Sequence, residues 1–301
     1  MTTDVFEEHR SLLTGAAYRI LGTAADAEDV VQEAWLRWNA VDQTAVDDPR
    51  AYLVTIASRL AIDRLRSARS RRESYVGEWL PEPVSDLPDG ADHAELADTV
   101  EYALLVVLES LSPLERAVFV LREAFQFPYS RIAEIIGREE AATRQLARRA
   151  RDHVRERRHR FDTDKESRRR ITERFLRATL EGDLDGLTAL LADDAVLVAD
   201  GGGKARSPLR ILHGVRRVAG FLHGVAQGRN TRRFLASVGL TGIEGIDSGI
   251  TEVNGAPAGY VAVHGRIVTL GILDVADGRI RSVYLVSNPD KLSRLRTPGT
   301  P

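Results

Sequence analysis

Residues 130–151 read SRIAEIIGREEAATRQLARRAR, and this stretch decides the fold of the chain around it. The isoleucines of IAEII give a short helix one apolar face, and Gly137 supplies the backbone freedom for a sharp turn. The spacing of a second helix then buries Thr143, Leu146 and Ala150. The pattern predicts a helix-turn-helix.

The other side of this second helix is basic. Its arginines recur at steps of four, three and four residues along one face: Arg144, Arg148, Arg151 and Arg155. Such a face fits a DNA major groove, where arginine reaches phosphates and guanine edges and Gln145 can address adenine. The plainer alternative is a solvated helix face, but the turn glycine, core spacing and basic face together favour DNA binding.

Charge along the 301 residues supports a polyanionic partner. The net charge of −2 hides basic blocks at residues 50–75 and 113–160, each net +5, and acidic blocks at residues 1–49, net −7, and 81–112, net −8. Two basic surfaces separated by an acidic spacer suggest nucleic acid. An arginine-rich composition, with 39 arginines among 42 basic residues, is the competing explanation.

Composition excludes several classes of protein. The hydrophobic fraction of 43% and charged fraction of 29% are ordinary for packed soluble domains. The longest apolar run, Ala103 to Leu108, is too short to span a bilayer, so we expect a cytoplasmic protein with no membrane partner. The absence of cysteine excludes disulfides and thiolate metal sites, and we expect no metal and no cofactor.

The chain divides into a helical part and a mixed part. Apolar periodicity predicts two helices between Val5 and Trp38, and Asp48-Pro49 starts a third. Residues 76–98 combine prolines with acids and predict a flexible linker. Beyond it we expect a helix at about 96–111, another opened by the capping box Ser112-Pro-Leu-Glu115, and then the helix-turn-helix.

After residue 160, glycine-punctuated alternation follows two helices at about 167–180 and 184–191. The strand candidates are 195–199, 232–240, 243–246, 250–253, 258–264, 267–274 and 280–286. Asn254-Gly255 and Asp277-Gly278 predict hairpin turns. We therefore expect an α+β domain, with helices on one side of a curved antiparallel sheet.

Residues 26–38, DAEDVVQEAWLRW, form an acidic helical face with apolar residues that look exposed. Asp26, Asp29 and Glu33 would repel DNA. This face therefore serves either solvent or a basic protein partner.

Three segments carry a family resemblance. Residues 26–38, 49–69 and 130–151 resemble regions 2.2, 2.3 to 2.4 and 4 of an extracytoplasmic-function (ECF) RNA polymerase sigma factor. Three short words, Trp79-Leu-Pro-Glu-Pro83, Asp200-Gly-Gly-Gly-Lys204 and Asn288-Pro-Asp-Lys-Leu292, resemble the sigma-J-like group with a fused SnoaL-like C-terminal extension.

The resemblance implies a multidomain fold, with two all-α sigma domains followed by an α+β SnoaL-like cone. The divisions are a region 2 domain at 1–75, the flexible linker at 76–98, a region 4 helix-turn-helix domain at 99–160 and the SnoaL-like domain at 165–301. The implied function is that of an alternative-sigma transcription initiation factor. It binds core RNA polymerase, on the clamp helices of the largest subunit, and directs it to promoter DNA.

The resemblance also assigns residues. Those that bind core polymerase are Asp26, Asp29, Val30, Val31, Gln32, Glu33 and Trp35. Those that bind DNA are Arg59, Arg64, Arg66, Arg69, Ser130, Arg131, Thr143, Arg144, Gln145, Arg148, Arg149 and Arg151. A regulatory interdomain contact, acting in cis, involves Trp79, Pro81, Pro83, Asp200, Gly201, Gly202, Gly203, Lys204, Asn288, Pro289, Asp290, Lys291 and Leu292.

The recognition helix departs from the family pattern in two ways. Thr143 stands where the family usually has valine. Glu139 and Glu140 suit the helix dipole but would be repelled by phosphates, which leaves the base contacts open.

An alternative keeps the C-terminal domain as a small-molecule binder or enzyme. Its available polar residues are His213, His223, Tyr260, His264 and Asp274, but no spacing among them demands catalysis, and we predict no catalytic residue. A polar, open pocket with two convergent titratable groups would favour the enzyme, whereas a closed or apolar pocket would favour regulation. A small-molecule ligand of this domain stays open.

Overall fold

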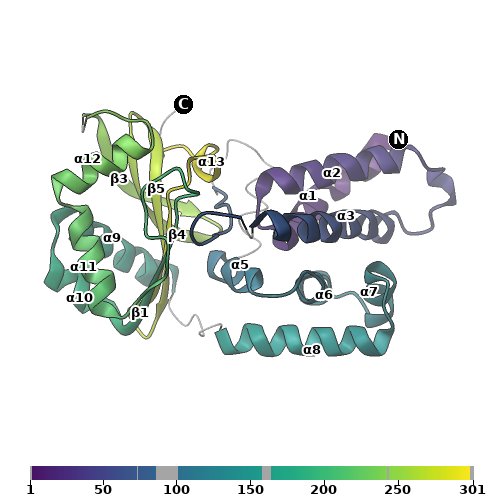
Figure 1. Cartoon of the computed structure of the whole chain (residues 1–301). Helices are drawn as coiled ribbons and strands as arrows, with labels where there is room; N and C mark the ends of the chain where they lie inside the picture. The colour runs from purple at the N-terminus through teal and green to yellow at the C-terminus, as the bar shows by residue number, and fades with distance from the viewer. Residues whose placement is uncertain (1, 73, 86–100, 158–163, 243, 299–301) are drawn as a thin grey trace. The chain divides into compact units, whose positions relative to one another are not determined.

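The computed structural model describes residues 2–72, 74–85, 101–157, 164–242 and 244–298. It divides into two compact units: Met1–Glu73 with Pro88–Arg158, and Ser74–Leu87 with His159–Pro301. Figure 1 shows the chain with its helices and strands labelled. None of the helices within the described ranges is long and apolar enough to cross a lipid bilayer.

The first unit begins with three helices and a short 3-10 turn, in this order: α1 (Thr2–Leu21), α2 (Ala24–Asn39), η1 (Gln43–Ala45) and α3 (Pro49–Arg72). Their core contains the buried Leu13, Trp38 and Leu53. The predicted start of α3 is confirmed, because the Asp48 carboxylate accepts a hydrogen bond from the Ala51 amide at 2.9 Å and Pro49 is the first helical residue.

The described residues of this unit contain four further helices: α5 (Tyr102–Glu109), α6 (Pro113–Glu123), α7 (Tyr129–Ile136) and α8 (Glu140–Arg157). The capping box of Ser112 and Glu115 is confirmed at the start of α6. Gly137 ends α7 with a φ of 66°, in the left-handed region, and this confirms the helix-turn-helix. Of the helix expected at 96–111, residues 96–100 lie outside the described ranges.

The two helical parts of this unit contact each other through a buried arginine. Arg116 on α6 is 1% exposed and donates to the Arg19 carbonyl on α1 at 2.8 Å. Its second guanidinium nitrogen pairs with Glu109 at 2.7 Å. Burial lowers the pKa of the neighbouring Arg19.

The second unit contains a six-stranded sheet with helices on one face (Figure 1). Its helices are α9 (Lys165–Glu181), α10 (Leu184–Leu190), α11 (Val215–Val225), α12 (Gly228–Ser237) and α13 (Pro289–Leu292). Its strands are β1 (Leu191–Asp200), β2 (Leu212–His213), β3 (Ile246–Val253), β4 (Ala256–Val263), β5 (Arg266–Ala276) and β6 (Arg279–Val286).

The strand order is β2-β1-β6-β5-β4-β3. Strands β1 and β6 pair in parallel and the other neighbours pair antiparallel, so the sheet is mixed rather than wholly antiparallel as expected. The parallel pair is possible because a long crossover connection, including α11 and α12, separates these strands in sequence.

The hairpin turns are confirmed, because Asn254-Gly255 and Asp277-Gly278 all have positive φ, as a two-residue type I′ turn requires. The strand predicted at 232–240 is wrong: helix α12 covers most of that range. Of the strand predicted at 243–246, residue 243 lies outside the described ranges and β3 begins only at Ile246.

Residues 76–85 differ from the expected flexible linker, because they pack against the second unit. The segment Leu80-Pro81-Glu82-Pro83-Val84 is buried throughout. Val84 exchanges two hydrogen bonds with Asn254, of 3.0 and 3.1 Å, and Ser85 forms a bridge with Val253 at the edge strand β3. The rest of the predicted linker, residues 86–98, lies outside the described ranges.

Candidate functional site: helix faces and a linker clasp

Helix α8 presents the basic face expected of the second helix. Arg144, Gln145, Arg148 and Arg149 are all exposed, and the Arg148 side chain is 85% exposed. Thr143 is instead fully buried and donates to the Glu139 carbonyl at 3.0 Å. Its side chain therefore belongs to the core between the two helices and has no direct access to DNA in this conformation.

Several of these arginines are held by acids of the same unit. Arg144 pairs with Glu140 at 2.5 Å, Arg149 with Glu115 at 3.5 Å and Arg151 with Glu123 at 3.1 Å. Arg151 also donates to the Tyr129 hydroxyl. The Arg148 guanidinium has its nearest acid, Asp152, at 3.8 Å. Arg148 is therefore more available than Arg144, Arg149 and Arg151.

The start of α7 carries two more predicted contacts. Ser130 is exposed, whereas Arg131 is partly buried and donates to Glu134 at 2.7 Å and to the Thr55 hydroxyl of α3 at 3.2 Å. Arg131 thus joins α7 to α3.

Arg59 on α3 is engaged within the first unit rather than free for nucleic acid. It donates to the carbonyls of Glu134 and Ile135 at 2.9 and 3.2 Å, at the C-terminus of α7. Cations are favoured there because the last carbonyls of a helix lack partners. Arg66 pairs loosely with Asp63 at 3.4 Å, and the side chain of Arg69 lies outside the described ranges.

Arg64 also has intramolecular partners, because it pairs with Asp26 at 2.7 Å and with Asp29, both on α2. Partial burial lowers the pKa of Arg64, but the hydrogen bonds and charges of these two aspartates outweigh it, and the pKa is raised overall. The structure therefore brings a predicted DNA contact together with two predicted polymerase contacts.

The acidic face of α2 combines charge with exposed apolar surface. Asp29, Gln32 and Glu33 are exposed, and Trp35 is 40% exposed. Leu36, 53% exposed, was not predicted from the sequence. The predicted Val30 and Val31 are each 2% exposed and pack inward. A groove of about 510 Å³ lies beside Trp35, lined also by residues of α1.

The three short words converge on a buried ion pair in the second unit. Lys291 on α13 pairs with Asp200 at the end of β1 at 2.7 Å, with side chains 6% and 0% exposed. The Lys291 ammonium also donates to the Leu80 carbonyl and lies 3.2 Å from the ring centroid of Trp79. Asp200 in turn accepts from the Leu80 amide at 2.9 Å. One lysine and one aspartate therefore hold both backbone groups of Leu80.

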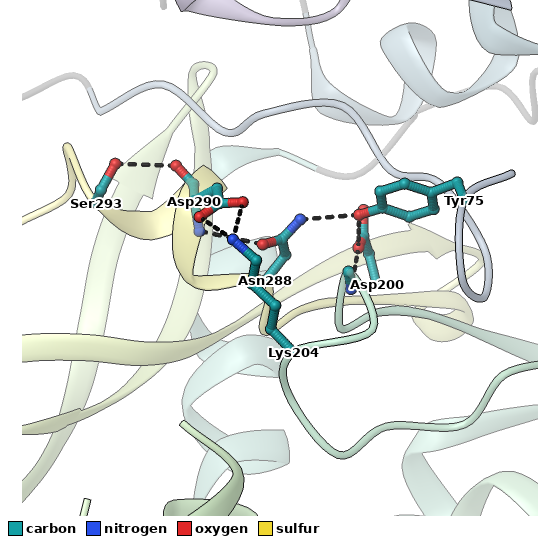
Figure 2. A network of polar contacts seen from close by, with 7 residues as sticks. Tyr75, Asp200, Lys204, Asn288, Asp290 and Ser293 are labelled. Carbon is teal, nitrogen blue, oxygen red and sulfur yellow. Dashed lines mark hydrogen bonds and ion pairs between the residues drawn. The ribbon is translucent and has the colours of Figure 1, made fainter. Parts of the chain in front are cut away.

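Tyr75 adds a second layer of contacts, shown in Figure 2. Its hydroxyl donates to Asp200 at 2.5 Å and accepts from the Asn288 amide at 2.8 Å. Burial, with the hydrogen bond and charge of Asp200, raises the pKa of Tyr75, so its hydroxyl stays protonated. We call Tyr75, Leu80, Asp200, Asn288 and Lys291 the linker clasp.

The glycines of the second word allow close approach around the clasp. Gly202 has a φ of 62°, and a Cβ there would lie 2.4 Å from the Asn288 amide nitrogen. Gly203 has a φ of 70°, and a Cβ would lie 3.1 Å from Val76 of the linker. Lys204 pairs with Asp290 at 2.6 Å on the surface beside the clasp (Figure 2).

The other predicted regulatory residues lie in the same region. Pro81 and Pro83 are buried in the linker, Gly201 follows Asp200, and Leu292 is buried beside the half-buried Pro289. Tyr75 and Asn254 were not predicted. Tyr75 is an aromatic residue just before an acidic proline segment, which was a readable signal, whereas Asn254 was assigned only to a turn.

The five polar residues considered for catalysis in the C-terminal domain do not converge. His213 and His264 are exposed on β2 and at a hairpin turn. The remaining three form hydrogen bonds with other residues. His223 contacts the Gly182 carbonyl at 2.7 Å, and Tyr260 donates to the Asp247 carboxylate at 3.3 Å. Asp274 accepts from the Ser282 hydroxyl at 3.5 Å. Across the part of the chain that the structure describes, no group of three or more metal-ligating side chains is present.

Comparison with known proteins places these features in a family. Models for Sigma-70 region 2 and Sigma-70, region 4, match residues 5–71 and 102–154. ECF RNA polymerase sigma factor SigJ of Mycobacterium tuberculosis is 39% identical over 97% of this chain and 94% of its own length. The probable ECF RNA polymerase sigma factor SigI of that organism is 40% identical over 61% of this chain and 64% of its own length.

A crystal structure supports the same relationship. That of the M. tuberculosis extracytoplasmic function sigma factor SigJ superposes with a TM-score of 0.75 at 37% identity. The match covers 97% of this chain and 98% of that chain, so it includes both helical parts and the C-terminal sheet domain.

Proposed function

This chain belongs to the extracytoplasmic-function family of RNA polymerase sigma factors, and from that premise we propose how its surfaces direct promoter recognition and how its C-terminal domain controls them. The family assigns the chain to transcription initiation, with region 4 as a DNA-binding helix-turn-helix.

The exposed face of α2 docks on core polymerase, with the clamp helices of the largest subunit as partner. Asp29, Gln32 and Glu33 supply polar and acidic contacts, and Trp35 supplies an aromatic anchor beside a groove. Leu36 extends the apolar part of this face.

Helix α8 reads duplex promoter DNA with Arg144, Gln145, Arg148 and Arg149. Its charge attracts phosphates, and its exposed guanidinium groups reach base edges in the major groove. Arg59 and Arg64 of α3 contact the promoter only after they leave the α7 carbonyls and the α2 aspartates that now hold them. Initiation therefore includes a rearrangement inside the first unit.

The C-terminal domain regulates the sigma domains in cis through the linker clasp. The observation that carries this proposal is the buried Lys291–Asp200 pair, which holds Leu80 of the segment joining α3 to α5 in sequence. A buried pair of opposite charges is strongly destabilised when one partner is removed, so loss of either Lys291 or Asp200 should release the linker. Chain held by the clasp is not available to the sigma domains.

Run-off transcription with core polymerase tests this function. The wild type should direct specific initiation, and Lys291→Ala should change the transcript yield because it releases the linker. Lys204→Ala is the matched control, because Lys204 forms an exposed ion pair next to the clasp. Limited proteolysis between residues 74 and 85 reports release directly. A released linker with an unchanged transcript yield would show that the clasp does not regulate.

The enzyme alternative gains little from the geometry. The domain has a cavity of about 580 Å³, but none of the five polar candidates lines it. Arg206 is the ionisable side chain among the described lining residues, and one cation at a rim is not an acid-base pair.

A further inference from the structure

The cavity of the C-terminal domain lies between the sheet and helices α9, α11 and α12, with a volume of about 580 Å³. We infer that it is a binding site for an uncharged, largely apolar small molecule that carries one hydrogen-bond acceptor. Its volume is in the range of small-molecule sites. The inference goes beyond the proposed sigma function, since a binding measurement tests it without transcription.

The lining selects against a charged ligand. Phe175, Phe221, Phe234 and Leu285 are among the side chains that form its walls. Arg206 is exposed to solvent, so its charge is already hydrated. Away from Arg206, a charged group placed among the apolar walls would lose hydration with no counter-charge to replace it.

Two glycines leave space on the floor of the cavity. Gly259 on β4 and Gly271 on β5 are paired across the strands, and neither has a positive φ. A Cβ on Gly271 would lie 3.8 Å from the Gly259 carbonyl oxygen and 4.0 Å from Phe175, which are ordinary contacts. The backbone therefore does not require glycine here. The missing side chain leaves room that a ligand can fill.

One polar pair lies in this apolar floor. The hydroxyls of Thr269 on β5 and Ser287 after β6 are 2.9 Å apart, and Ser287 is 1% exposed. Each hydroxyl has one hydrogen, and the pair uses one of the two. Among the described residues, the second hydroxyl hydrogen has no further hydrogen-bond acceptor. It can therefore be donated to an oxygen atom of a ligand.

The cavity shares its wall with the linker clasp. Ser287 immediately precedes Asn288, and the lining residues 206–208 follow Lys204 in the chain. Ser287 and Asn288 both donate their amides to the Asp200 carbonyl, at 2.8 and 2.9 Å. A ligand in the cavity therefore contacts the two segments that hold the linker.

Fluorescent probes test the site in the full-length chain. N-phenylnaphthylamine is uncharged, and anilinonaphthalenesulfonate carries similar rings with a sulfonate. We expect saturable binding of the uncharged probe, and binding of the sulfonate weaker by about tenfold or more. Equal or tighter binding of the sulfonate would overturn the assignment to uncharged ligands.

Two variants fill the cavity from opposite sides. Gly271→Val acts from the floor and Gly220→Leu from α11, where an added Cβ has nothing within 4 Å. Each variant should weaken the binding of N-phenylnaphthylamine by about tenfold. Ser248→Val, which places valine on β3 outside the lining, is the matched control and should bind like the wild type. Circular dichroism checks that each variant folds.

Should Gly271→Val fail to fold, Gly220→Leu decides alone, because leucine suits a helix better than glycine. Prodan, an uncharged naphthalene ketone, tests the acceptor. Removal of both hydroxyls, by Thr269→Val combined with Ser287→Ala, should weaken Prodan binding several-fold and leave N-phenylnaphthylamine binding unchanged. No saturable binding to the wild type, or equal binding to the folded filled variants, would overturn the site.

Discussion

Lys204 and Lys291 each pair with an aspartate of the second unit, but they differ in burial. Lys291 and Asp200 are 6% and 0% exposed, whereas Lys204 and Asp290 are 56% and 64% exposed. Removing one partner of a buried pair leaves a charge without water or counter-charge, whereas an exposed pair exchanges its partner for solvent.

We therefore expect Lys291→Ala to lower the local unfolding free energy of the second unit by about 3–5 kcal/mol, and Lys204→Ala to lower it by less than about 1 kcal/mol. Hydrogen exchange of the β5 and β6 amides in the full-length chain measures both. Equal protection in the two variants would contradict the burial argument.

Arg148 makes a prediction about DNA. Its side chain is 85% exposed and its nearest acid is 3.8 Å away, so little intramolecular pairing competes with DNA. Arg148→Ala should weaken holoenzyme binding to a promoter fragment by about 1–3 kcal/mol if the residue reads a base. If Arg148 instead contacts a phosphate, the slope of log affinity against log salt concentration should become shallower by about one. Arg174→Ala, on the exposed side of α9, is the control and should change neither quantity.

Among the elements, Gly137 and Gly202 are two of the left-handed glycines, and their surroundings differ. Gly137 ends α7 with φ 66° and open space around a Cβ, whereas Gly202 has φ 62° with Asn288 at 2.4 Å from that position. Gly137→Ala should therefore cost about 1–2 kcal/mol from backbone strain alone. Gly202→Ala should also displace Asn288 and speed linker proteolysis. Identical proteolysis of the linker in the two variants would count against close packing at Gly202.

The face of α2 gives a second prediction at this scale. Asp29 is tied to Arg64, so its reversal would alter the fold locally, whereas Glu33 pairs only with the exposed Arg37 in the described structure. Glu33→Lys combined with Trp35→Ala should reduce core polymerase affinity by about tenfold or more. Glu173→Lys on α9 is the charge control. Unchanged core binding by the double variant would argue against this docking face.

Local signals explain which elements were predictable. The Asn-Gly and Asp-Gly turns and the capping box depend on residues adjacent in sequence, so they could be read directly. The region 232–240 misled because Phe234, Ala236, Val238 and Leu240 alternate as in a strand. In the structure this range is mostly helix α12, with Leu235 as its buried residue. Tertiary packing, and not the local alternation, decides the conformation here.

The clasp was only partly readable for a related reason. The three short sequence words could be identified from the sequence. Their proximity in space depends on the parallel pairing of β1 with β6, which no local pattern specifies. The acids and prolines of residues 76–98 predicted a flexible linker. The apolar Trp79, Leu80 and Val84 among them were the signal that this segment packs.

At the scale of the whole molecule, two truncations distinguish the effect of the entire C-terminal domain from the effect of the linker clasp. Ending the chain after Ser287 removes Asn288 and Lys291, while the six strands remain. Ending it before Lys165 removes the entire domain. If the domain acts in cis, we expect the two truncated chains to differ in promoter activity, as run-off transcription measures. Matching transcript yields from both truncations and the full-length chain would reject regulation by this domain.

All five residues of the linker clasp belong to one polypeptide. A restraint supplied by a separate protein responds to the ratio of two gene products, because binding follows mass action. In the regulation that we propose, the restraint is part of the molecule that it restrains, one copy for one copy. Doubling synthesis of the chain therefore doubles the closed and the released forms alike, and the fraction released stays independent of copy number. Under this proposal the level of expression would set how many chains respond, and an event that opens the clasp would set the fraction released.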